Sequence, residues 1–118
     1  MMKFALLIYG KETYNKQLSE EQESEMLELH HHLQATTIEK EEFIASARLE
    51  WTETAKTVSS DNKGEILVTD GPFAETKEQF LGLYLLDCAS ENDAIQYAAS
   101  LPLTHHKIEV RPVGWCRA

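Results

Sequence analysis

Two stretches of the chain, residues 4–9 and 80–86, contain no charged side chain and are apolar along almost their whole length. Each has the length of a β-strand and is bounded by polar or turn residues. Because successive side chains of a strand point to opposite faces of a sheet, a strand that is apolar throughout must be covered on both faces. These two strands therefore require a sheet that is packed on both sides.

A helix is predicted after each of these two strands. Ser19 and Gln22 form a Ser-x-x-Gln pattern that is typical of a helix N-terminus, and this helix is expected to run to about Glu39. Ser90 and Asp93 make a similar start for a short second helix, which ends before the proline at position 102.

The remaining segments are predicted as strands, turns and loops. Residues 43–51 alternate between apolar and more polar side chains, as a strand does. Residues 55–69 predict a β-hairpin with its turn at residues 61–64. The last strand is expected at residues 107–113, and residues 11–17 are expected to form a polar loop.

This order predicts one α+β domain over residues 1–118, with a ferredoxin-like β-α-β-β-α-β plan and an inserted β-hairpin. Both helices would cover the same face of a mainly antiparallel sheet. The opposite face would then expose an apolar patch too large to leave in water. We therefore expect a homodimer in which two copies pack sheet against sheet.

A sharp bend is predicted where the hairpin leads into the strand at 80–86. Asp70 is followed by Gly and Pro, which permit or impose a break in the strand. Phe73 is expected to pin the loop against the body, while Glu75 and Lys77 present charge to a cleft. The alternative is a tight turn in which Asp70 hydrogen-bonds only the backbone of its own turn.

Residues 70–78 (Asp-Gly-Pro-Phe-Ala-Glu-Thr-Lys-Glu) resemble the signature of the DGPF-domain proteins, a branch of the YCII-related (YciI-like) family. The resemblance extends to the opening at residues 3–9, a Gly-x-Tyr strand at 82–84 and the close at 108–113, so it covers nearly the whole chain. It implies a dimeric α+β barrel. It also implies a cleft between the first helix and the sheet, lined by a helix histidine and a loop aspartate.

Three consecutive histidines lie in the first predicted helix. At about 100° per residue, one side of this helix carries Met26, Leu29, Leu33 and Thr37. His30 falls within this side, His31 lies at its edge and His32 faces outward with glutamates. The three side chains are therefore not equivalent, and His30 is the one expected to face inward.

The first functional hypothesis is a small-molecule enzyme. If His30 matches the family histidine, Asp70 could hold its imidazole in one tautomer, and the pair could transfer protons near neutral pH. Such a dyad suits proton abstraction beside a carbonyl, in isomerisation or elimination on a small acidic substrate. The resemblance implies lyase or dehalogenase chemistry of this kind. Candidate substrate-binding residues are Arg48, Phe73, Glu75 and Lys77.

The second hypothesis is a non-enzymatic, dimeric ligand-binding or regulatory accessory module. The resemblance suggests it, because genes of DGPF proteins often lie near those of alternative sigma factors. Such a module would have a cleft but no turnover, and it would tolerate the loss of His30. Separate substitutions of His30 and Asp70 would distinguish the two hypotheses.

A metal site is the third hypothesis, with His30, His31, His105 and His106 as the available ligands. Adjacent histidines on a helix point about 100° apart, and adjacent residues of a strand point to opposite faces. No local spacing brings three ligands together, so neither a metal nor another cofactor is expected. The chain also lacks a phosphate loop and a dinucleotide fingerprint.

Composition narrows the partners and the compartment. The formal charge is −9, with 20 acidic and 11 basic residues. The sequence has no basic patch, so nucleic acid is not an expected partner. Cys88 and Cys116 are the only cysteines, and free thiols suggest the cytoplasm. No stretch is long and apolar enough to predict a membrane span or a signal peptide.

Overall fold

The computed structural model describes residues 1–118 and contains a four-stranded antiparallel sheet in the order β2-β5-β1-β6. Its strands are β1 (Met2–Gly10), β2 (Phe43–Arg48), β5 (Gln79–Cys88) and β6 (His106–Pro112). In this order the apolar strands β1 and β5 occupy the centre, and the more polar β2 and β6 form the edges. This topology is compatible with the expected ferredoxin-like α+β fold.

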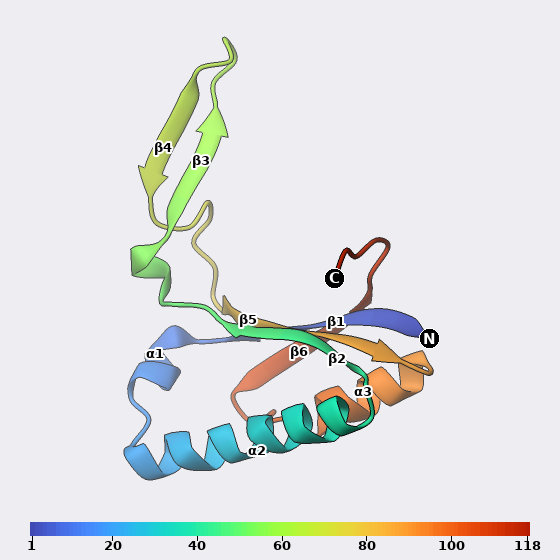
Figure 1. Ribbon diagram of the computed structural model, residues 1–118. Helices are drawn as coiled ribbons and strands as arrows, with labels where there is room; N and C mark the ends of the chain where they lie inside the picture. The colour runs from blue at the N-terminus through green and yellow to red at the C-terminus, as the bar shows by residue number, and fades with distance from the viewer.

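The two longer helices lie against one face of the sheet (Figure 1). Helix α2 spans Glu20–Glu39 and begins with the predicted capping box, because Ser19 accepts from the backbone N–H of Gln22 and the Gln22 side chain accepts from that of Ser19. Helix α3 spans Glu91–Ala99, and its N-cap Ser90 accepts from the backbone N–H of Asp93. Both helix starts were therefore readable from local chemistry.

The core lies between these helices and the inner side chains of β1 and β5. Antiparallel pairing places Phe4 opposite Leu86 and Leu6 opposite Tyr84, and all four side chains are almost fully buried. The cluster is completed by buried residues from the rest of the sheet and both helices, namely Leu33, Cys88, Ala94, Ala98 and Leu101. On α2, Leu33 and Thr37 are buried as predicted, whereas Leu29 is 44% exposed and the prediction for it is wrong.

Helix α1 (Glu12–Lys16) replaces the polar loop that the sequence predicted for residues 11–17. Its stability comes from contacts made far along the chain. The carboxylate of Glu12 accepts from the backbone N–H and the hydroxyl of Thr52, at 2.7 and 2.8 Å. The backbone N–H of Glu12 donates to the side-chain carbonyl of Gln79 at 2.9 Å. Local sequence patterns carry no information about such partners.

A bulge near the start of β2 reverses the alternation of its side chains. The register of β2 against β5 shifts between Phe43 and Ala45. Phe43 still packs against the core, but after the bulge Ser46 and Arg48 are the residues that pair with Tyr84 and Gly82. The more polar side of this strand therefore faces the helix layer.

Strands β3 (Lys56–Ser60) and β4 (Ile66–Asp70) form a separate two-stranded hairpin, which we call the arm. A short 3-10 helix, η1 (Thr52–Thr54), precedes the arm. In the turn of the arm, Gly64 has a φ of 83°, which glycine readily adopts. The arm projects away from the body (Figure 1). Val58, Ile66 and Val68 lie on one of its faces and are 63–69% exposed.

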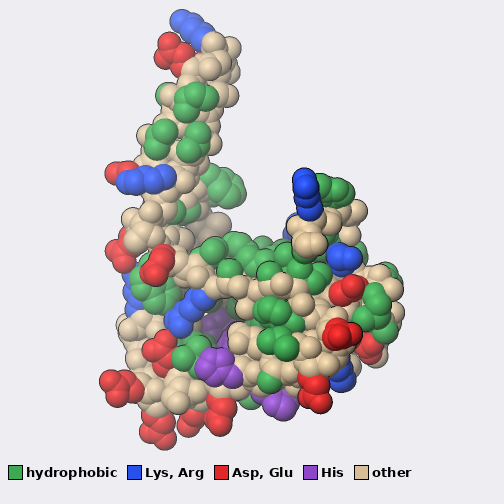
Figure 2. Space-filling model, viewed as in Figure 1, with side chains coloured by type: hydrophobic (Ala, Val, Ile, Leu, Met, Phe, Trp, Pro, Cys, Tyr) green, Lys and Arg blue, Asp and Glu red, His purple; other side chains and the backbone are tan.

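The face of the sheet opposite the helices, here called the open face, carries no element of this chain. It is largely apolar, because the register places Ala5 and Leu7 of β1 beside Leu85 and Leu83 of β5. The arm and the C-terminal tail both rise from this side of the molecule, and apolar side chains spread between them (Figures 1 and 2). Trp115 in the tail is 82% exposed. No helix has the length and apolar character that crossing a membrane would require.

Candidate functional site

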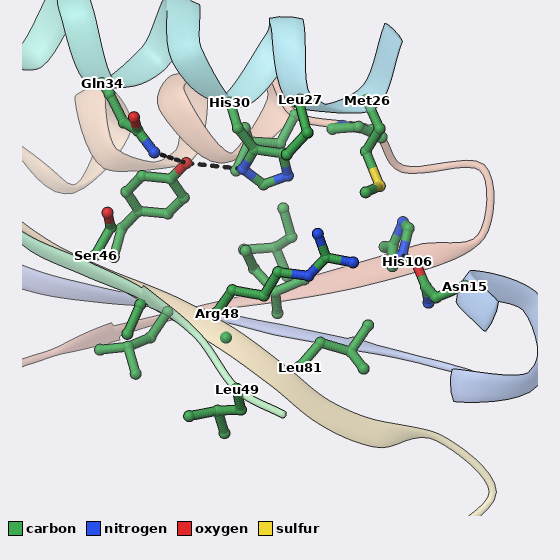
Figure 3. Close-up of a pocket in the computed structure, with 18 of the residues that line it drawn as sticks. Asn15, Met26, Leu27, His30, Gln34, Ser46, Arg48, Leu49, Leu81 and His106 are labelled. Carbon is green, nitrogen blue, oxygen red and sulfur yellow. Dashed lines mark hydrogen bonds between the residues drawn. The ribbon is translucent and has the colours of Figure 1, made fainter. Parts of the chain in front are cut away.

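A pocket of about 140 Å³ lies between helix α2 and the sheet, and we call it the α2 pocket (Figure 3). Helix α2 supplies one wall, β2 and β5 supply the floor, and the start of β6 closes one end. Its polar lining consists of Asn15, His30, Gln34, Ser46, Arg48, Tyr84 and His106, together with the edge residue His31. Met26, Leu27, Leu81 and Trp51 contribute apolar surface.

His30 enters the pocket from the inner side of α2, as the helical periodicity predicted. Its Nδ1 lies 2.7 Å from the Tyr84 hydroxyl oxygen, and the two rings are nearly parallel, with an interplanar angle of 6°. Burial lowers the pKa of His30 to about 4, and the neighbouring His106 and Arg48 side chains act in the same direction. The imidazole is therefore neutral near pH 7.

Tyr84 is held from two sides within the pocket. It stands on the central strand β5 and is only 2% exposed. Besides its contact with His30, its hydroxyl oxygen accepts from the Gln34 side-chain N–H at 3.4 Å. Gln34 lies one helical turn after His30 on the same side of α2, so both side chains reach the same hydroxyl (Figure 3).

Arg48 brings a permanent positive charge to the pocket. Its guanidinium points into the cavity below His30 (Figure 3) and forms an ion pair of 3.1 Å with Glu23 of α2. The guanidinium carbon also lies 6.0 Å from the ring centre of Trp51. Because its side chain is about half exposed, the pair with Glu23 is weak and leaves other N–H groups free.

His106 forms the end of the pocket at β6. The side-chain N–H of Asn15 donates to the Lys11 carbonyl at 3.0 Å, which fixes the amide and turns its oxygen toward His106. The Nε2 of His106 lies 3.1 Å from that oxygen, which can only accept, so Nε2 carries the proton. Gly10 leaves room for the ring, since a Cβ there would lie 2.7 Å from it.

The charge in the α2 pocket is opposite to that of the whole chain. None of the residues that line it is Asp or Glu, although the chain has 20 acidic residues and a formal charge of −9. Histidines and basic side chains instead gather around a hollow below the base of the arm (Figure 2). An arginine beside the neutral imidazole of His30 in a partly apolar cavity favours an anionic ligand over a cationic one.

Asp70 does not reach His30 within this chain. It ends β4, as the sequence predicted, and the φ of 92° at Gly71 produces the bend. Its side chain is 87% exposed, forms an ion pair with Lys56 across the arm and does not line the pocket. The His30–Asp70 pair that the family resemblance implied is therefore not formed here.

Of the four predicted substrate-binding residues, one lines the pocket and three do not. Arg48 lines the α2 pocket, as just described. Phe73 is 90% exposed, so it does not pin the loop against the body of this chain. Glu75 and Lys77 are exposed in the same loop and do not line the pocket. The structure thus brings together His30 and Arg48 but none of the loop residues.

Several pocket residues escaped the sequence reasoning. Tyr84 and Ser46 carried a usable signal, because each places a polar group within an otherwise apolar stretch of strand. Gln34 could have been found from its i+4 relation to His30. Asn15 and His106 had no such signal, since they lie 91 positions apart and meet only in the folded chain.

The histidines do not come together as a metal site. The chain contains no group of three or more His, Cys, Asp or Glu side chains arranged to hold a metal ion. His105 stacks on Tyr14 with ring centres 3.8 Å apart, away from His30. Both cysteines are free, and burial together with nearby Glu42 raises the pKa of Cys88 to about 11, which disfavours its reactive thiolate.

Two comparisons with known proteins identify what this chain is similar to. A family model described as YCII-related domain matches residues 2–114. An uncharacterized protein of Rhizobium meliloti (strain 1021) is 37% identical over 116 residues, which cover 96% of this chain and 93% of that protein. These matches do not separate branches of the family, so the DGPF branch stays a prediction.

Proposed function

This chain belongs to the YCII-related family, and we propose that its α2 pocket binds a small organic acid. The observation that carries the proposal is the charge of the pocket. Arg48 and neutral His30 face one cavity that no carboxylate lines, within a strongly acidic chain. A carboxylate ligand would meet the free N–H groups of Arg48, which can bind both of its oxygens.

The size and lining of the pocket describe the rest of the ligand. A volume of about 140 Å³ is below the range of about 300 Å³ and above that is usual for drug-sized ligands. Met26, Leu27 and Leu81 offer apolar surface next to the polar groups. These features suit a compact acid with a short apolar or aromatic body.

Fluorescence of Trp51, which lines the pocket, gives a direct test. The second tryptophan, Trp115, is replaced by Phe to leave one reporter. The protein is titrated with benzoate and with benzamide, which has the same shape but no charge. We expect saturable binding of benzoate and at least about tenfold weaker binding of benzamide, because the charged hydrogen bonds to Arg48 are lost.

A matched pair of variants assigns the binding to the pocket. Arg48→Gln should abolish the preference for benzoate over benzamide, whereas Arg117→Gln in the C-terminal tail should leave it unchanged. Equal binding of benzoate and benzamide by the unchanged protein, or benzoate binding that survives Arg48→Gln, would exclude the proposal.

Catalysis on a small keto acid is a second candidate function. It is favoured by the neutral imidazole of His30 beside Arg48, an arrangement that could assist proton transfer next to a carbonyl. Pyruvate in D₂O is a suitable probe, because enolisation replaces its methyl protons with deuterium. Exchange that is faster with the protein than with its His30→Gln variant would support an enzyme, and equal exchange would favour a binding module.

We also infer that the protein acts as a homodimer, built on the open face and the arm. Both surfaces are apolar, both lie on the same side of the molecule, and no part of this chain covers them (Figures 1 and 2). A two-fold partner presents the same surfaces in return, so one association would cover all of them.

A further inference from the structure

We propose that Tyr84 fixes His30 as its Nε2–H tautomer, so that His30 donates a hydrogen bond to the ligand's oxyanion alongside Arg48 rather than removing a proton from it. The first part concerns the free protein, and the second rests on the proposed binding of a small organic acid. Tyr84 is thus a positioning residue, acting through His30.

The tautomer follows from a count of hydrogens at one hydroxyl. A tyrosine hydroxyl has a single hydrogen to donate and can also accept. The oxygen of Tyr84 already accepts from the Gln34 amide N–H, at 3.4 Å. Its own hydrogen then needs an acceptor, and His30 Nδ1, at 2.7 Å, is the group in reach. A nitrogen that accepts cannot carry the ring proton of a neutral imidazole.

The opposite tautomer leaves a buried group without a partner. If Nδ1 of His30 carried the proton, it would donate to Tyr84, whose own hydroxyl hydrogen would point at no acceptor. Tyr84 is 2% exposed, so water does not replace the missing bond, and an unmade buried hydrogen bond costs about 1–3 kcal/mol. The Tyr84→His30 direction gives both the hydroxyl hydrogen of Tyr84 and the Nδ1 of His30 a partner.

The consequence for the ligand follows from where the remaining proton lies. In the inferred tautomer the second ring nitrogen, Nε2, carries it on the side of the ring away from Tyr84. The guanidinium of Arg48 points into the same cavity and has only donors (Figure 3). Two donors facing one space select an acceptor such as a carboxylate, a carbonyl or an enolate oxygen. They do not select a group that must give up a proton.

Imidazole nitrogen NMR tests the tautomer without any ligand. The protein is labelled with ¹⁵N-histidine and measured at pH 7, where long-range ¹H–¹⁵N correlations show which ring nitrogen is protonated. We expect Nε2 of His30 to be protonated and Nδ1 to be bare. A protonated Nδ1 in the unchanged protein would overturn the proposal.

Two substitutions sharpen this measurement. Gln34→Glu puts a carboxylate acceptor beside Tyr84, so the hydroxyl hydrogen should turn to it and the tautomer of His30 should reverse. Tyr84→Phe removes the donor and should leave a mixture of both tautomers. Tyr9→Phe removes a hydroxyl elsewhere on the sheet and should change nothing. A tautomer that stays the same in Gln34→Glu and Tyr84→Phe would show that Tyr84 does not control it.

Benzoate then tests the role of the donor. Its addition should shift the His30 Nε2–H signal of the unchanged protein, and Gln34→Glu should bind benzoate about 10- to 100-fold more weakly, as expected for a lost bond to a charged group. Benzoate that binds without moving this signal would overturn the donor role of His30. If benzoate binds to none of the proteins, the proposed function fails, and with it the donor role, while the tautomer result stands by itself.

Discussion

Arg48 of strand β2 and Glu23 of helix α2 form an ion pair of 3.1 Å that connects the sheet to the helix beside the α2 pocket. The same guanidinium is the group that would receive a carboxylate ligand. On the proposed function, Glu23 and a carboxylate ligand therefore compete for the charge of Arg48.

This competition predicts that Glu23→Gln tightens the binding of benzoate. The exposed ion pair is worth about 0.2–1 kcal/mol, so its removal should lower the dissociation constant by up to about fivefold. Titration of Trp51 fluorescence measures the change. Glu109→Gln, which breaks the exposed pair with Arg111 on β6, is the matched control and should have no effect. Weaker binding after Glu23→Gln would mean that Glu23 supports the ligand site instead of competing with it.

Asp70→Asn should leave the α2 pocket unaffected. The Asp70 side chain is 87% exposed and pairs with Lys56 on the arm, so its charge does not act on His30 within the chain. We expect unchanged benzoate affinity and a change of less than about 0.5 kcal/mol in the free energy of unfolding, as is usual for exposed sites. A large loss of benzoate binding or of pyruvate exchange would instead indicate that Asp70 of one copy pairs with His30 of another copy.

Acidification should destabilise the protein through His30 and His106. Burial lowers the pKa of His30 to about 4 and also lowers that of His106, whereas an unfolded histidine titrates near 6.5. Below pH 6.5 the unfolded chain therefore binds more protons than the folded one, and the free energy of unfolding falls as the pH drops toward 4. Urea unfolding at pH 7 and pH 5 measures this loss.

Two single variants identify the histidine responsible for the pH effect. His30→Gln should reduce the difference in unfolding free energy between pH 7 and pH 5, because it removes one of the titrating groups. His32→Gln should leave the difference intact, since His32 is exposed on the outer side of α2. A His30 ring that titrates near pH 6.5 by NMR would contradict this explanation.

Loss of apolar surface on the arm should weaken the dimer. Val58 and Val68 face each other across the two strands and are 66% and 63% exposed in the single chain. Replacing both with Ser should raise the dimer dissociation constant at least about tenfold, because each buried Val contributes about 1.5–3 kcal/mol. Light scattering after gel filtration should give twice the chain mass of 13.5 kDa for the unchanged protein.

The opposite face of the arm supplies the control for this experiment. Thr57 and Thr69 pair across the same strands but point to the other side. Thr57→Ser and Thr69→Ser together should leave the mass in solution unchanged. An unchanged protein that is monomeric at micromolar concentration would exclude the homodimer, whatever the variants do.

Local chemistry was enough to predict most elements of this fold, but not helix α1. The apolar runs of β1 and β5, the N-caps Ser19 and Ser90 and the glycine turn of the arm each involve residues within a few positions of one another. The bend after Asp70 is of the same kind. Such signals persist in the fold because their hydrogen bonds and backbone angles hardly depend on the rest of the chain.

The sequence by itself determined the strands, helices α2 and α3 and the inward side of α2, on which His30 lies. Only the tertiary structure decided what His30 faces. Tyr84 on β5 contacts its ring, and Arg48 reaches the same pocket because of the bulge in β2. Asp70 lies on the arm, where it pairs with Lys56 instead. The physical reason is that helix phase and capping depend on neighbours in the chain. The contents of a pocket depend instead on strand register and on the direction of a hairpin, which are decided by contacts between residues distant in sequence.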